Sequence, residues 1–177
     1  RNKIEFYQAL AEVKSRNLLI SSGYEPQRQH IERQMELAAL ELTSSSGLSS
    51  SAPRSAKQLL AEICELSFHP SSIPVLIKVL HQRFSETKKQ AGNWRYGHKA
   101  LALVEYLIKN GNDRFLIIAR HDVVFHFVED LKEFQHEDTV IRESVRQTAH
   151  RVRALIQSGS KNRTLKHYAV VEDIESF

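Results

Sequence analysis

Five basic residues fall close together in the sequence: Arg83, Lys88, Lys89, Arg95 and Lys99. They lie at the end of one predicted helix, in the loop 86–92 and at the start of the next helix. These three pieces of a helical hairpin meet at one corner, where the second helix adds free amides and the positive end of its dipole. The pattern predicts a corner that holds a phosphorylated headgroup. A solvated corner that only maintains solubility is the alternative.

No other set of residues has the spacing of a catalytic or metal site. The sequence contains no G-x-S-x-G element, no Walker loop and no Gly-rich phosphate cradle. Cys64 has no evident activating neighbour. His121 and His126 are five residues apart, whereas a helical chelate needs a spacing of about four. We therefore expect a protein without catalytic activity, metal or cofactor.

Composition narrows the class of protein. The length of 177 residues suggests one domain, and the 41% hydrophobic content is enough for a core. The formal net charge of +4 permits an anionic partner without requiring one. The single cysteine excludes an internal disulfide and suits a reducing compartment. No apolar run reaches the roughly 18 residues of a membrane span and no signal peptide is visible, while an Arg at position 1 indicates a fragment.

The stretch 93–111, which reads NWRYGHKALALVEYLIKNG, must position the basic corner. Asn93 suits an N-cap, and Gly111 followed by Asn112 suits a C-terminal cap. Apolar residues recur between them at three- and four-residue steps, and a second apolar line widens the face. A helix that is apolar around most of its circumference is buried on most sides. We therefore expect a central helix with other helices packed around it.

Similar spacing predicts helices over 26–42, 55–68, 72–85 and 139–157, and over 113–134 with a break at 121–122. The Ser-rich stretch 43–55 is typical of a solvated linker. No alternating strand pattern rises above background. We predict an all-α fold in which helical hairpins stack side by side as a solenoid. Its domain would span 26–160, with an N-terminal segment 1–25 and a tail or last helix 161–177.

The first twenty residues also have helical spacing. Their apolar side contains Ile4, Tyr7 or Phe6, Leu10 and Val13. Their cations include Arg1, Lys3 and Lys14. Two interpretations stay open: an ordinary amphipathic helix that packs against the domain, or a segment that folds on a lipid surface with its cations at the headgroups.

Three stretches of the central helix together resemble the ENTH domain of epsin-related clathrin adaptors. Positions 93–95, 99–101 and 104–111 read NWR, KAL and VEYLIKNG, similar to the family's N-W-R, K-A-L and L-E-Y-L-I-K-x-G in order and spacing. Downstream, LKEFQ at 131–135 and IRE at 141–143 resemble the family's L-K-D-F-Q and V-R-E. The resemblance implies a right-handed superhelix of about eight helices, of the ENTH/VHS type, and a non-catalytic role in bringing clathrin coats to membranes.

The family's headgroup pocket is only partly kept. Arg83 matches its Arg near the end of the third family helix, whereas Gly92 stands where a Lys is expected. Tyr96 occupies the position of a His, and the family's first-helix Arg falls near Leu40. The sequence therefore resembles a divergent or Golgi/endosomal relative more than a plasma-membrane epsin. In such relatives lipid preference weakens and the fold binds helical domains of SNARE proteins.

Three functions follow. The first is a phosphoinositide-binding adaptor module, cytoplasmic and peripheral on trans-Golgi, endosomal or clathrin-coated vesicle membranes, with clathrin and adaptor proteins as partners of regions outside this chain. The second is a protein-binding solenoid that recognises a SNARE or another helical cargo. The third is a reader of phosphorylated polymerase tails, which the lack of a dense basic run disfavours. No nucleic acid partner is expected. The lipid-binding candidates are Arg83, Lys88, Lys89, Arg95, Lys99, Arg1, Lys3 and Lys14.

Overall fold

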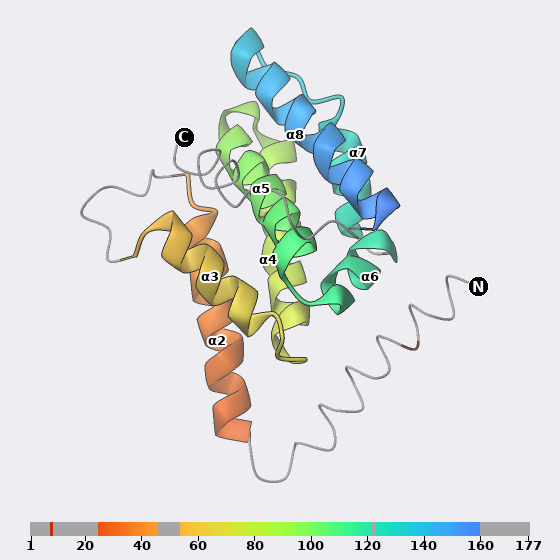
Figure 1. Cartoon of the computed structure of the whole chain (residues 1–177). Coiled ribbons are helices and arrows are strands. Elements are labelled where there is room, and N and C mark those ends of the chain that lie inside the picture. The colour runs from red at the N-terminus through yellow and green to blue at the C-terminus, as the bar shows by residue number, and fades with distance from the viewer. Residues whose placement is uncertain (1–7, 9–24, 46–53, 122, 160–177) are drawn as a thin grey trace.

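The structure is a computed structural model that describes Gln8 and residues 25–45, 54–121 and 123–159. These residues form seven α-helices and no strand. The helices are α2 (Glu25–Leu42), α3 (Ala56–Leu66), α4 (Ser72–Lys89), α5 (Trp94–Asn110), α6 (Asp113–His121), α7 (Val123–Leu131) and α8 (Thr139–Ser158). A short 3-10 helix, η1 (Ala91–Asn93), joins α4 to α5. The all-α prediction is confirmed (Figure 1). The expected segments 1–20 and 161–177 lie outside the described residues, apart from Gln8.

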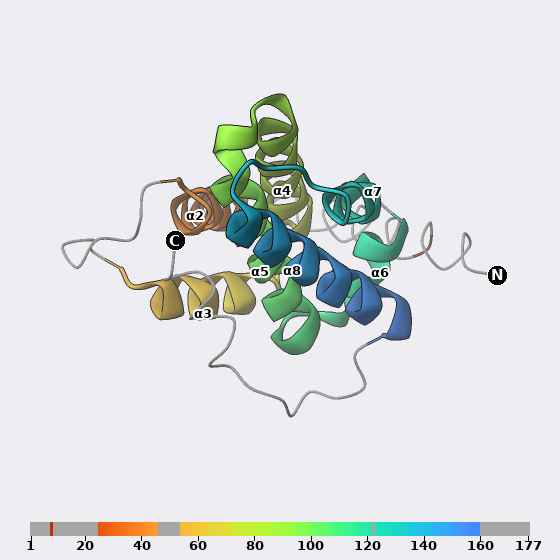
Figure 2. The same ribbon diagram turned by 90° about the horizontal axis from the view of Figure 1, so that it is seen from above.

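Helix α5 occupies the middle of the molecule, as the apolar pattern of 93–111 predicts. It contacts α3, α4, α6 and α8, and both views show it enclosed by them (Figure 1, Figure 2). Every residue from Gly97 to Ile108 is buried. A helix enclosed in this way can fix its neighbours relative to one another, so the ends of α2, α4 and α8 have defined places around its N-terminus.

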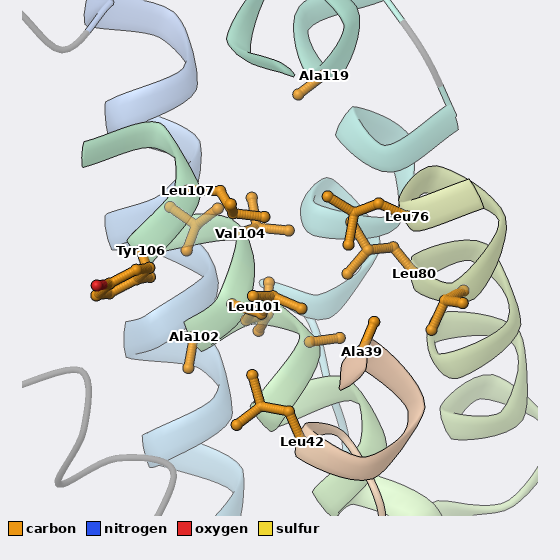
Figure 3. Close-up of a cluster of buried hydrophobic side chains, with 14 of the residues drawn as sticks. Ala39, Leu42, Leu76, Leu80, Leu101, Ala102, Val104, Tyr106, Leu107 and Ala119 are labelled. Atoms are coloured by element: carbon orange, nitrogen blue, oxygen red, sulfur yellow. The ribbon is translucent and has the colours of Figure 1, made fainter. Parts of the chain in front are cut away.

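The core lies where α5 faces α4 and α2. Figure 3 shows Leu101 and Val104 of α5 directed toward Leu76 and Leu80 of α4. All four side chains are fully buried. Tyr106 points to the other side of α5, toward α8. Burying aliphatic side chains of this size stabilises the fold by about 1.5–3 kcal/mol each, so this seam is a large part of what holds the helices together.

Two helix starts follow their local sequences, and two other helix boundaries are exceptions. Ser55 forms a reciprocal capping box with Gln58, and Asp138 caps α8 by accepting the amides of Val140 and Ile141. By contrast, the Asn93 side chain accepts no amide of α5 and instead donates to the carbonyl of Glu86 at 3.3 Å. Our prediction of a side-chain N-cap at Asn93 is therefore wrong, because η1 already directs that side chain back to α4.

The second exception concerns the loop 86–92. Helix α4 continues to Lys89, four residues past the predicted end. Its last turn is held by Thr87, whose hydroxyl donates to the carbonyl of Arg83 at 2.9 Å. The predicted loop is thus mostly helix, which gives Lys88 and Lys89 fixed positions. Among the described helices, none combines the length and the hydropathy that crossing a bilayer would need.

Candidate anion-binding corner

Helices α4 and α5 meet closely at the end where the basic residues gather. Gly97 of α5 packs against Thr87 of α4, and a Cβ at position 97 would lie 2.7 Å from the Thr87 hydroxyl oxygen. A glycine is therefore required for this approach. The contact brings the last turn of α4, η1 and the first turn of α5 into one corner, as the sequence predicts. The five cations of this corner nevertheless separate into two sets.

Arg83 belongs to the buried set. Its side chain is only 10% exposed. Its guanidinium donates to the Thr43 hydroxyl and to the Leu40 carbonyl, each at 3.0 Å, and to the Glu86 carboxylate at 2.9 Å. All three directions of the planar fork are thus used within the fold. Arg83 fastens the C-terminal end of α2 to α4.

The pKa of the Glu86 carboxylate is lowered by its neighbours in this arrangement. Burial raises its pKa, but hydrogen bonds from Gln82 and Arg83, together with the charge of Arg83, hold the pKa of Glu86 below its usual value. The carboxylate therefore stays ionised beside Arg83 and neutralises part of the charge that a ligand would otherwise meet.

Lys99 is the second buried cation. Its side chain is fully buried, and its ammonium donates to the Ser44 carbonyl at 2.8 Å. Burial, reinforced by the nearby charge of Arg95, lowers the pKa of Lys99. The contact of Arg83 and Lys99 with a lipid stays a prediction, and in the described geometry both charges are engaged within the fold. Both charges hold carbonyls where α2 ends, because that segment crosses over them.

Arg83, Tyr96 and Leu40, which the resemblance aligns with the family's headgroup pocket, lie next to one another in the structure. The Arg83 guanidinium stacks over the Tyr96 ring, 4.5 Å from its centroid, while it also binds the carbonyl of Leu40. The three positions are thus adjacent in space. At two of them the resemblance predicts a polar side chain, a His at 96 and an Arg near 40, whereas this chain has the Tyr96 ring and the Leu40 carbonyl there. Gly92 lies in the open, and a Cβ there would meet no atom within 4 Å.

Lys88, Lys89 and Arg95 form the exposed set, which we call the outer cations. The Lys88 side chain is 48% exposed, pairs with the Asp130 carboxylate of α7 and lies 5.1 Å from the Phe127 ring centroid. Arg95 is exposed and stacks on Trp94 at 5.1 Å. Lys89 is exposed at the last position of α4. These three can contact an anion from outside. The other candidates, Arg1, Lys3 and Lys14, lie outside the described residues.

The sequence pattern also misses a role for the arginines of α8. Arg146 donates to the Phe134 carbonyl at 2.8 Å, and Arg142 donates to the His136 carbonyl at 3.2 Å. Arg151 bonds the buried carboxylate of Glu105 at 3.1 Å. These side chains fix the α7–α8 connection and hold α8 on α5. An acidic residue inside the apolar run 100–108 is the signal that could have indicated such a partner.

Titratable groups elsewhere do not build a second site in the part of the chain that is described. No cluster of three or more potential metal ligands occurs there. The Cys64 thiol donates to the Asn110 carbonyl, and burial raises its pKa, so it is mostly unreactive thiol rather than thiolate. Cys64 lies partly buried against the hydrophobic core.

The chain resembles known proteins over most of its length. The family model of the ENTH domain matches residues 33–162. Human Epsin-3 is 29% identical over 115 residues, which cover 63% of this chain and 17% of Epsin-3. Clathrin interactor EPSIN 1 of Arabidopsis thaliana is 32% identical over 116 residues, 63% of this chain and 20% of that protein. The matched region is thus a small part of these relatives.

Solved structures show the same fold. The yeast Ent1 ENTH domain aligns with a TM-score of 0.59 and 22% identity, covering 80% of this chain and 91% of that one. A chain in the structure of the endocytic adaptor complex AENTH aligns with a TM-score of 0.58 and 21% identity, covering 94% and 96%. At these identities the similarity concerns the arrangement of helices.

Proposed function

The chain belongs to the ENTH domain family, and from this premise we propose that it is a peripheral membrane-adaptor module of clathrin-coated vesicle traffic. In this proposal it contacts phosphoinositide headgroups through Lys88, Lys89 and Arg95. Clathrin and adaptor proteins would be partners of the whole protein. The membrane would be that of the trans-Golgi network, an endosome or a coated vesicle, on its cytoplasmic side.

The observation that carries this proposal is the placement of the outer cations. All three are exposed, and they come from the last turn of α4 and the first turn of α5, which a close Gly97–Thr87 contact holds together. Two of them are partly ordered by aromatic rings, Lys88 by Phe127 and Arg95 by Trp94. Cations that are already oriented lose less side-chain entropy when they bind an anion.

The same geometry supports a weaker headgroup contact than a fully polar pocket would give. Arg83 is engaged by Leu40, Thr43 and Glu86, and Tyr96 covers its guanidinium. A headgroup would therefore rest on the outer cations instead of entering between α2 and α4. Attraction of this kind is screened over about 8 Å at physiological ionic strength, so binding should depend strongly on salt.

Vesicle co-sedimentation at physiological salt, with one phosphoinositide per vesicle, tests the proposal. We expect selective binding of the wild-type chain. The double variant Lys89→Glu with Arg95→Glu should bind at least about 30-fold more weakly, since each Lys or Arg near an anionic surface contributes about 1 kcal/mol. Arg83 is left unchanged in this test because its loss would disturb the fold.

A matched control changes the same charge at another place. Lys57 on α3 and Lys78 on α4 are both exposed, and neither belongs to the last turn of α4 or the first turn of α5. The variant Lys57→Glu with Lys78→Glu should retain wild-type binding. Equal losses in the two double variants would mean that only net charge matters. If the wild-type chain sediments no better with phosphoinositide vesicles than with neutral ones, the adaptor proposal fails and a SNARE pull-down becomes the next experiment.

A further inference from the structure

A groove of about 500 Å³ runs between α2 and α4, at the end of these helices opposite to the anion-binding corner. The groove is lined by Gln29, Glu32, Arg33, Glu36 and Leu37 of α2 and by Val75 and Lys78 of α4. The α2 residues lie at helical spacing and form one continuous face. Leu37 is 52% exposed there, one of three large hydrophobic side chains that the described residues leave exposed. In the described part of the chain no ion pair engages Glu36.

We propose that residues 1–20 of this same chain dock into this groove as an amphipathic helix antiparallel to α2. The segment can reach the groove, because residues 21–24 are all that separate it from Glu25, the first residue of α2. Connections of about two to eight residues are usual between antiparallel helices. Gln8, the one described residue of the segment, is helical and exposed, and it lies on the opposite side of a helix from Leu10.

An antiparallel alignment of residues 1–20 with α2 brings apolar side chains of the two helices to the same level. Leu37 follows Glu25 by twelve residues. With equal rise in both helices, about 1.5 Å per residue, Leu37 faces the level of Gln8, twelve residues before Ile20, between the side chains of Tyr7 and Leu10 on the apolar side of the segment. The same register places Lys14 within about one residue of Glu32, a carboxylate that Arg28 already binds at 3.0 Å. The match between the two helices is therefore an apolar one, in which a side chain of the segment meets Leu37 and Val75.

Docking uses the apolar side of the segment that insertion into a bilayer would also need. The two states exclude each other, so the groove would hold the segment until a membrane competes for it. This consequence rests on the function proposed above. The docked state itself does not, and it can be tested without any lipid.

Limited trypsin digestion of the 177-residue chain, followed by intact-mass spectrometry, measures docking. The readout is the initial rate of cleavage after Lys14 and Arg16. Because cleavage follows the population of the open form, we expect it to be about tenfold faster in Leu37→Asp than in the wild-type chain. Leu10→Asp, on the other side of the contact, should give the same increase.

Phe68→Asp is the matched control, since Phe68 is 58% exposed and lies outside the groove. It should leave the rate unchanged, and circular dichroism should show wild-type helicity in all three variants. Equal rates in the wild-type chain and in both groove variants would overturn the proposal and leave the groove to a different partner. Protection that grows with protein concentration would also overturn it, because a second copy would then occupy the groove. Loss of vesicle binding with trypsin protection intact would count against the proposed function alone.

Discussion

Two sets of cations lie at one corner of this molecule and have opposite tasks. Arg83 and Lys99 are buried and bind oxygens where α2 ends. Lys88, Lys89 and Arg95, a few residues away in sequence, are exposed at the ends of α4 and α5. Residue type alone therefore does not assign a basic residue to a ligand. What decides is whether another segment of the chain passes over it.

The largest effect should come from breaking the buried set. In Arg83→Ala the Leu40 carbonyl and the Thr43 hydroxyl lose the Arg83 donor, and the half-buried carboxylate of Glu86 loses its charged partner. We expect the free energy of unfolding to fall by about 3–5 kcal/mol. Urea denaturation followed by circular dichroism measures this change. Lys89→Ala, from the exposed set, should stay within about 0.5 kcal/mol of wild type, and a similar loss in both variants would contradict the division.

His98 extends the buried set and makes it sensitive to acid. The imidazole is fully buried beside Thr148, and burial lowers its pKa to about 4, with the charges of Arg151 and Lys99 acting in the same direction. Because the unfolded chain takes up this proton near the ordinary pKa of 6.5, stability is complete above pH 6.5 and is lost as the pH falls toward 4. The loss should reach about 3 kcal/mol.

Denaturation at a series of pH values checks this expectation. His98→Gln should lose most of the dependence between pH 6.5 and 4, whatever its stability at neutral pH. His150→Gln removes an exposed imidazole and should keep the wild-type profile. Glu86 and Glu129, whose pKa values lie below the usual 4.5, add their own losses only at lower pH. A wild-type profile that is flat from pH 6.5 to 4 would contradict the burial of a neutral His98.

The exposed set can be sharpened by adding a cation. Gly92→Lys places a side chain where no atom lies within 4 Å of its Cβ, between Lys89 and Arg95. One more cation at an anionic surface should strengthen vesicle binding by about 1 kcal/mol, or roughly fivefold, with little change in stability. Co-sedimentation compares it with Gly92→Gln, which has similar bulk and no charge. Equal affinities for the two variants would show that the headgroup does not approach η1.

The smallest effect should come from releasing Lys88. Asp130→Asn removes the carboxylate that pairs with it, and both side chains are about half exposed. An exposed pair is worth about 0–1 kcal/mol, so the stability should barely change. Vesicle binding should become about two- to threefold tighter, because the Lys88 charge is no longer shared and one negative charge is removed. Unchanged binding after this change would place Lys88 outside the contact.

Much of the fold could be predicted from periodicity. The spacing of apolar residues indicated α5 as the central helix, and the interruption at 121–122 does separate α6 from α7. The end of α4 could not be predicted, because ETKK has no apolar residue to extend the pattern. Packing of Thr87 against Gly97, a contact between two helices, keeps that turn helical.

For the candidate anion-binding corner, too, one part could be predicted from the sequence and another part could not. That five cations gather where α4 meets α5 could be predicted from the sequence, because helical rise and a short connection place them together. Which of them face water depends on contacts between helices that are distant in the chain. The crossing of the α2 end over Arg83 and Lys99 brings Leu40, Thr43 and Ser44 to them from about 40 to 55 residues away in the chain. Periodicity describes each helix separately, so it contains no information on which distant carbonyl will cover a given side chain.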